Sequence, residues 1–303
     1  MSDLPPALGG QRFEFDSPAG RLSCYVAGQG APLLLVHSVN AAASAAEVRP
    51  LYDHWQATRT VFALDLPGYG FSDRSDRAYT PRLMTDSLHA TLAQVEQRCG
   101  KAPVAALAVS LGCEFLARAA VEAPARFRCL ALVSPTGFNG TRRRRGPPGS
   151  VVGAPWIGRV LRGPGWGGPL FRALTRPGVI HYFLRRTWGG PAIDLEMARY
   201  AELTTRVPGA EHAPLAFLSA QLFSADITTV YEQLTQPVWM SHGVRGDFTD
   251  YRGKDSVAGR ANWRFTVFPA GALPYFEVSQ DFNAALEDFL AFTASPAGVR
   301  GLG

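Results

Sequence analysis

One serine of the chain stands in a setting that could make its hydroxyl a nucleophile. Ser110 follows the apolar run 104–109 and precedes a helical pattern, with Ala108 two residues before it and Gly112 two residues after it. Small residues at these positions are needed where a strand turns sharply into a helix, because larger side chains would collide in the strained turn. A serine hydroxyl exposed on such a turn suits covalent attack on a carbonyl carbon.

Attack on a carbonyl also requires backbone N–H groups that stabilise the developing oxyanion. The N–H of Leu111 follows the serine at the start of the expected helix, where free donors and the helix dipole favour negative charge. The loop after the apolar run 32–37 is expected to supply a second donor. These features indicate an acyl-transfer site with a nucleophile and an oxyanion hole.

The elements that would position this serine alternate as in an α/β protein. An opening hairpin is expected from residues 12–16 and 21–27. Strands buried on both faces are expected at 32–37 and 61–65, and further strands at 103–109, 127–133, 237–242 and 263–268. Helices are expected near 45–55, 81–98, 111–122 and 280–292. This order predicts a mostly parallel sheet with helices on both faces.

Residues 140–233 interrupt this alternation. They open with a charged, Pro- and Gly-rich run, which short amphipathic stretches at helical spacing follow. We therefore expect a mainly helical insertion at 140–233 between two parts of one core, residues 1–139 and 234–303. A chain of 303 residues suits one large α/β domain with such an insertion.

The ordered motifs resemble those of the α/β-hydrolase superfamily in its capped, single-domain form. The matching pieces are His37-Ser38, Asp65-x-Pro67-Gly68-x-Gly70-x-Ser72-Asp73, Ala108-x-Ser110-x-Gly112 and Gly271-Ala272-Leu273-Pro274-x-Phe276-Glu277. The resemblance covers about residues 12 to 293. It implies that Ser110 is the nucleophile and that the N–H groups of Val39 and Leu111 form the oxyanion hole. It also implies that His37 orients the oxyanion loop by hydrogen bonding.

The acid and the base of the family's catalytic triad match less well. The acid usually follows the strand after the cap, which makes Asp247 the best match and Asp250 the fallback. The family's Gly-His-x-Pro pattern aligns with Ala272 in the histidine position, and alanine cannot accept a proton. No histidine follows His242 in the sequence. Loss of a triad member costs on the order of 10⁴ to 10⁶ in turnover, so we expect hydrolysis to be severely impaired or absent.

Three explanations of Ala272 stay open at this stage. The alanine is an engineered replacement in an active hydrolase, or a natural departure with another base or none, or the mark of a ligand-binding protein without turnover. His212 is the only histidine that we nominate as an alternative base. The leading interpretation is a hydrolase of a small apolar ester-like substrate. A ligand-binding protein and a non-hydrolytic lyase or isomerase are its alternatives.

The composition of the chain limits the kinds of partner and cofactor that we expect. The net charge is +5 and the pI is near 9.2, but no nucleic-acid-binding motif accompanies this charge, and the excess of arginine over lysine suggests a coding bias. No metal-ligand spacing and no dinucleotide motif is visible in the sequence, so no metal and no other cofactor is expected. We expect a small-molecule substrate or ligand and no nucleic acid.

The arginines at 142–145 are expected to form a solvated loop at the entry of the insertion. Together with aromatic and aliphatic residues at 156–171 they could touch an anionic membrane surface, but we expect these aromatics to line or cover a pocket. No apolar run approaches 18 residues and the N-terminus lacks the profile of a secretory signal, so a cytoplasmic location is expected. The four cysteines are widely spaced and are expected to be free.

Overall fold

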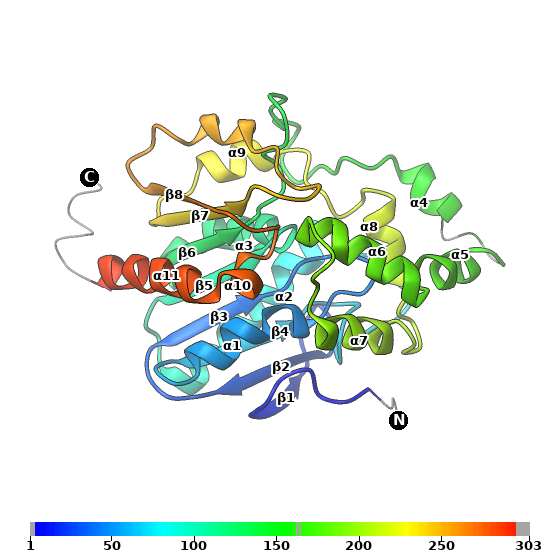
Figure 1. The fold of residues 1–303 in the computed structure, drawn as a ribbon, viewed down its shortest axis with the longest axis horizontal. Helices are drawn as coiled ribbons and strands as arrows, with labels where there is room; N and C mark the ends of the chain where they lie inside the picture. The colour runs from blue at the N-terminus through cyan, green and yellow to red at the C-terminus, as the bar shows by residue number, and fades with distance from the viewer. Residues whose placement is uncertain (1–3, 162, 164, 295–303) are drawn as a thin grey trace.

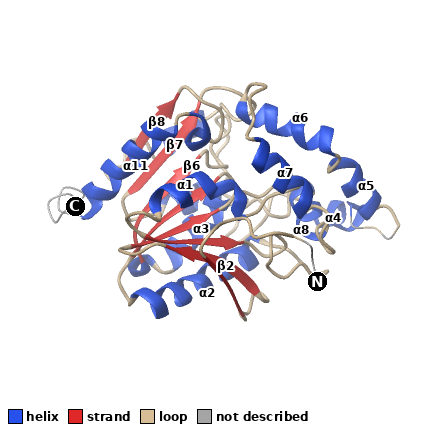
Figure 2. Ribbon diagram, turned by 60° about the horizontal axis from the view of Figure 1, so that its bottom comes forward, coloured by secondary structure: helices blue, strands red, loops and turns tan. Residues whose placement is uncertain are grey.

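The computed structural model describes residues 4–161, 163 and 165–294 and contains one sheet of eight strands with helices on both faces (Figures 1 and 2). The strands are β1 (Gln11–Phe15), β2 (Leu22–Ala27), β3 (Pro32–Val36), β4 (Thr60–Asp65), β5 (Val104–Val109), β6 (Phe127–Val133), β7 (Val238–Gly243) and β8 (Trp263–Phe268). Their order is β1-β2-β4-β3-β5-β6-β7-β8. The pairs β1–β2 and β2–β4 are antiparallel and all other pairs are parallel. The predicted mostly parallel sheet is therefore confirmed.

Alternate residues of each central strand enter the two hydrophobic layers. In β3, Leu34 and Val36 belong to the layer beneath α2 (Pro81–Cys99) and α3 (Gly112–Glu122). Leu33 and Leu35 belong to the opposite layer, beneath α1 (Arg49–Trp55) and α11 (Ser279–Ala294). Burial on both faces explains why these strands read as continuous apolar runs.

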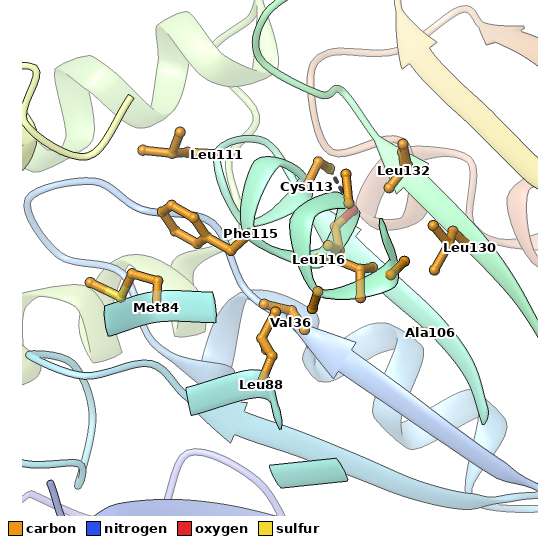
Figure 3. Packing of buried hydrophobic residues seen from close by; sticks show 14 of the residues in the cluster. Val36, Met84, Leu88, Ala106, Leu111, Cys113, Phe115, Leu116, Leu130 and Leu132 are labelled. Carbon is orange, nitrogen blue, oxygen red and sulfur yellow. Dashed lines mark hydrogen bonds between the residues drawn. The ribbon is translucent and has the colours of Figure 1, made fainter. Parts of the chain in front are cut away.

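The layer that contains α3 supports the candidate nucleophile. Figure 3 shows Cys113, Phe115 and Leu116 of α3 packed against strand residues such as Val36 and Leu132. The Cys113 thiol donates to the carbonyl oxygen of Ala108 at 3.1 Å, so this side chain packs as a small buried group. All four cysteines are free, as predicted.

The remaining helices follow in chain order. They are η1 (Ala45–Val48), η2 (Pro124–Arg126), α4 (Pro155–Leu161), α5 (Gly167–Leu174), α6 (Pro177–Trp188), α7 (Leu195–Thr204), α8 (His212–Leu218), α9 (Ile227–Glu232), η3 (Arg252–Ser256) and α10 (Pro274–Glu277). Local signals set several helix starts. At α2, Thr80 accepts a hydrogen bond from the N–H of Leu83 and Pro81 occupies the first turn.

Helices α4 to α9 lie between β6 and β7 in the chain, and α4 to α8 gather beside one edge of the sheet (Figure 1). A bridge between Val151 and Ser224 joins the first and last parts of the insertion, and an ion pair of 2.6 Å between Arg118 of α3 and Asp226 ties the insertion to the core. We call residues 140–233 the cap below. Among the described residues, no helix is long and apolar enough to cross a membrane.

Candidate active site

Ser110 forms the turn between β5 and α3 and has a φ of 52°, in the left-handed region that side chains rarely adopt. Its N–H donates to the carbonyl oxygen of Val133 on the neighbouring strand at 2.8 Å, which holds the turn. A Cβ at Gly112 would lie 2.5 Å from the carbonyl oxygen of His37, so only glycine lets the helix start this close to β3. Strain and close approach together present the hydroxyl at the carboxyl edge of the sheet.

A cavity of about 150 Å³ holds this hydroxyl. Residues that follow β3, β5, β6, β7 and β8 line one side of it, and residues of the cap line the other. The lining residues are Ser38, Val39, Asn40, Glu47, Ser110, Leu111, Ser134, Thr136, Leu184, Thr187, Met197, Phe217, Phe223, Phe248, Ala272 and Leu273. Ser110 and Ala272, more than 160 positions apart in the sequence, therefore share one enclosed space between core and cap.

The two expected oxyanion donors lie at this cavity. Val39 and Leu111 are both buried and both line it. Within the described part of the chain, the N–H of neither residue has a hydrogen-bond acceptor. Buried backbone donors are almost always paired, so two free ones beside a serine hydroxyl are a ready site for a developing oxyanion.

His37 is fully buried and holds the loop that carries Val39. Its Nε2 accepts the N–H of Leu66 at 3.0 Å, so Nδ1 carries the proton and donates to the carbonyl oxygen of Ser38 at 2.5 Å. Burial lowers the pKa of His37 to about 4. The imidazole does not line the cavity, and its hydrogen bonds are those of a loop-orienting residue.

Glu47 is a site residue that the sequence analysis missed. Its carboxyl group is buried, lines the cavity, and accepts hydrogen bonds from the Ser38 N–H at 2.9 Å and the Asn40 side-chain amide at 2.7 Å. Burial raises the pKa of Glu47 above its ordinary value, against the opposing effect of these hydrogen bonds. Among the described residues that line the cavity, it is the only carboxyl group, and none of them is a histidine, lysine or arginine. The only sequence signal was a lone acid in the apolar run 41–48.

Two hydrogen bonds hold the backbone of Ala272 in place. Its N–H donates to the carbonyl oxygen of Thr187 at the end of α6, at 2.9 Å, and its carbonyl oxygen accepts the Ser134 hydroxyl at 2.7 Å. A Cβ at the preceding Gly271 would lie 2.5 Å from the carbonyl oxygen of Trp188. The cap backbone thus packs directly on the loop that carries Ala272.

The predicted acids lie away from this cavity. Asp247 is 39% exposed at its side chain, forms an ion pair with Arg186, and does not line the cavity. Asp250 pairs with Arg252 at 2.7 Å and accepts the N–H of Gly140 at 3.0 Å, and these bonds lower the pKa of its carboxyl. The structure does not bring either carboxylate to Ser110.

The nominated alternative base also lies elsewhere. His212, at the start of α8, has its Nδ1 3.5 Å from a carboxylate oxygen of Asp76 and is absent from the cavity lining. Of the predicted site residues, the structure therefore brings together Ser110, Val39, Leu111 and Ala272. It leaves Asp247, Asp250 and His212 outside.

Comparisons with known proteins agree with this architecture. Residues 31–150 match the family model for the alpha/beta hydrolase fold. A thermophilic esterase from Thermogutta terrifontis has a TM-score of 0.70 at 18% identity, over 94% of this chain and 100% of that chain. A putative lipase from Acinetobacter baumannii AYE has a TM-score of 0.70 at 17% identity, over 94% and 92%.

An enol-lactonase from Burkholderia xenovorans LB400 has a TM-score of 0.67 at 16% identity, over 92% of this chain and 100% of that chain. Comparison with curated protein sequences gives no match. The chain is a protein of the α/β-hydrolase fold, and its solved neighbours include an esterase and a putative lipase. At these identities the likeness extends to the fold, so the chemistry has to be argued from the site.

Proposed function

We propose that the chain hydrolyses a small, neutral, apolar ester-like substrate through attack by Ser110. The observation that carries this proposal is the strained serine that shares a cavity of about 150 Å³ with two free backbone N–H donors. Leu184, Met197 and Phe223 give the opposite wall an apolar character. No cationic side chain lines the described cavity, which disfavours an anionic substrate because its charge would be desolvated without a partner.

Glu47 is our candidate for the group that takes up the serine proton. As the Ser110 oxygen bonds to the carbonyl carbon, its proton passes to the Glu47 carboxylate and the carbonyl electrons move to the oxygen held by Val39 and Leu111. Proton uptake neutralises Glu47 while negative charge develops beside it, which removes a repulsion. Collapse of the intermediate expels the alcohol oxygen, which takes the proton from Glu47. Water then hydrolyses the acyl-enzyme in the same way.

A carboxyl with a raised pKa is a better base than an ordinary glutamate, but it lacks the reach of an imidazole held by a third group. We therefore expect slow turnover. The resemblance implied severe impairment from Ala272, and this proposal keeps that expectation.

The test uses activated short-chain esters and a fluorophosphonate probe. The unaltered protein should hydrolyse the esters above the buffer rate, and mass spectrometry should locate the probe on Ser110 and not on Ser134 of the same cavity. Ser110→Ala should remove both signals. A folded protein with neither turnover nor labelling would instead indicate a binding protein.

Glu47 is tested separately. Glu47→Gln should lower kcat by roughly 100-fold, the usual contribution of a general base, with KM little changed. The unaltered rate should rise with pH through a midpoint above that of an ordinary glutamate, and this rise should vanish in the variant. An unchanged pH profile would leave Ser110 as nucleophile and exclude Glu47 as its base.

A further inference from the structure

The charge of the chain is divided unevenly along the sequence. Residues 140–193 contain ten arginines and no aspartate or glutamate. The rest of the chain has 20 Lys and Arg residues against all 25 Asp and Glu residues. The segment therefore carries +10 and the remainder −5, so the positive net charge belongs to part of the cap alone. A general preference for arginine over lysine does not explain the missing acids.

Several of these arginines are free to meet an external anion. Arg159 of α4, Arg172 of α5, and Arg176 and Arg185 beside or within α6 are exposed. None of the four has an ion-pair partner within the described residues. In contrast, Arg186 is paired with Asp247.

Large apolar side chains are exposed on the same helices. Trp156 and Val160 lie one turn apart on α4 and are 60% and 50% exposed, and Trp166 is 43% exposed. A Cβ at Gly163 would meet both the Trp166 ring nitrogen and the carbonyl oxygen of Val160, which places these residues beside one another. These aromatics were expected to line or cover a pocket, but Trp156 and Trp166 are exposed and neither lines the cavity of Ser110.

A second exposed pair follows on α6. Tyr182 and Phe183 are 52% and 55% exposed, and their rings meet edge to face with centroids 5.3 Å apart. Leu184 and Thr187 of the same helix line the cavity of Ser110. One helix therefore has aromatic side chains in solvent and other side chains at the candidate active site.

We propose that the outer surface of α4, α5 and α6 docks on an anionic lipid bilayer. Arginine attracts phosphate headgroups, and tryptophan and tyrosine prefer the headgroup level, where an apolar ring meets polar surroundings. A second copy of this face would bring the same positive charge against itself, which disfavours a symmetric dimer. Nucleic acid would satisfy the arginines but would not cover Val160 and its apolar neighbours. Docking places α6, and with it the cavity, next to the bilayer.

The test measures binding of the full chain to vesicles by co-sedimentation. Vesicles of phosphatidylcholine with phosphatidylglycerol should bind at least tenfold more tightly than vesicles of phosphatidylcholine alone, and added salt should reduce the difference. Arg159→Gln, Arg172→Gln and Arg176→Gln combined should weaken binding to the anionic vesicles by roughly 100-fold. Trp156→Ser with Trp166→Ser should weaken binding at every salt concentration.

The matched control is the combination of Arg21→Gln, Lys101→Gln and Arg260→Gln, which removes the same charge from exposed positions outside the cap. It should leave vesicle binding within about twofold, and unfolding temperatures should confirm that all variants are folded. Equal losses in the two triple variants would show a nonspecific charge effect and overturn the proposal. So would tight binding to duplex DNA with no binding to anionic vesicles. These readouts require no turnover, so they are independent of the proposed hydrolysis.

Discussion

At the residue scale, the strain at Ser110 is maintained by its neighbours. A non-glycine residue in the left-handed region costs on the order of 1–3 kcal/mol. The next strand repeats this arrangement, since Ser134 after β6 has a φ of 48° and donates its N–H to Ser241 at 2.7 Å. Two adjacent parallel strands thus end in the same strained way, each held by the strand beside it. Backbone strain of this kind lowers stability, so a functional site explains it more easily than a structural role does.

Replacement of Ala272 by histidine tests whether a base at position 272 can activate Ser110. Ala272→His should raise kcat/KM toward activated esters by roughly 100-fold, near the lower end of general-base contributions. Ala272 lines the cavity while its N–H and carbonyl are already bonded, so the backbone can stay in place. The gain should stop well short of a full triad, because Asp247 is paired with Arg186 and cannot orient the ring.

The control for this variant is the double substitution Ser110→Ala with Ala272→His, which should show no gain. Equal activity of the single and the double variant would mean that the new histidine acts without the serine. That result would contradict the role of Ser110.

Burial of His37 predicts a specific dependence of stability on pH. The unfolded histidine takes up a proton below its ordinary pKa of 6.5, whereas the folded one stays neutral until about 4. The contribution of His37 to the free energy of unfolding therefore has its full value above pH 6.5. It falls by about 3 kcal/mol as the pH drops from 6.5 toward 4. Chemical denaturation at several pH values should show this loss.

His37→Gln is the reference, because glutamine can accept the Leu66 N–H but takes up no proton. Carboxylates contribute equally to both proteins, so the difference in their free energies of unfolding isolates His37. That difference should shrink as the pH falls. A constant difference between pH 4 and 7 would mean that His37 titrates normally.

At the scale of elements, the order of strands and helices could be predicted because hydrophobic periodicity is local. Strand β5 is buried at all six positions, and the apolar run 103–109 indicated it. The helix expected at 45–55 is divided into η1 and α1, because Pro50 near the start of α1 ends the hydrogen bonding of the preceding turn. The positions of two acidic side chains could not be predicted, because they depend on tertiary contacts. Asp247 is held outward by Arg186 of the cap, and Glu47 is held inward by hydrogen bonds from Ser38 and Asn40.

Close contact between loops explains several glycines near the site. A Cβ at Gly243 would collide with the carbonyl oxygens of Gly271 and Ala270, and the N–H of Val244 donates to Ala270 at 2.9 Å. Gly243→Ala should therefore separate the loops after β7 and β8 and lower the free energy of unfolding by roughly 3 kcal/mol. Thermal and denaturant unfolding measure this change.

The matched control is Gly259→Ala, at a position where an added Cβ meets no atom within 4 Å. It should change stability by less than about 0.5 kcal/mol. Equal effects of the two substitutions would show that loss of glycine flexibility, and not the collision, controls stability.

At the scale of the whole molecule, the net charge conceals how the charged residues are distributed along the chain. The excess of arginine over lysine suggested a coding bias, and only the division of the net charge of +5 into +10 and −5 reveals a polarised protein. That signal was present in the sequence, since no acid occurs between Glu122 and Asp194. The exposure of Trp156 and Trp166 could not be seen in the sequence, because hydrophobic periodicity cannot distinguish a helix face that packs on the core from one that lies in solvent.

Burial also differs between core and cap, which predicts a gradient of local stability. In α3, eight of eleven residues are buried, whereas α4 buries only Gly158 and α5 only Gly167 and Phe171. Helices with few buried contacts open at low free energy. Amide hydrogen exchange should therefore be at least a hundredfold faster in α4 and α5 than in α3 and β5. Anionic vesicles should slow the exchange of α4 and α5 and leave α3 unchanged, since a docked helix has to release its contacts with lipid before it opens. Uniform exchange across the chain, or protection by vesicles that falls on α2 and not on the cap, would contradict this view of the molecule.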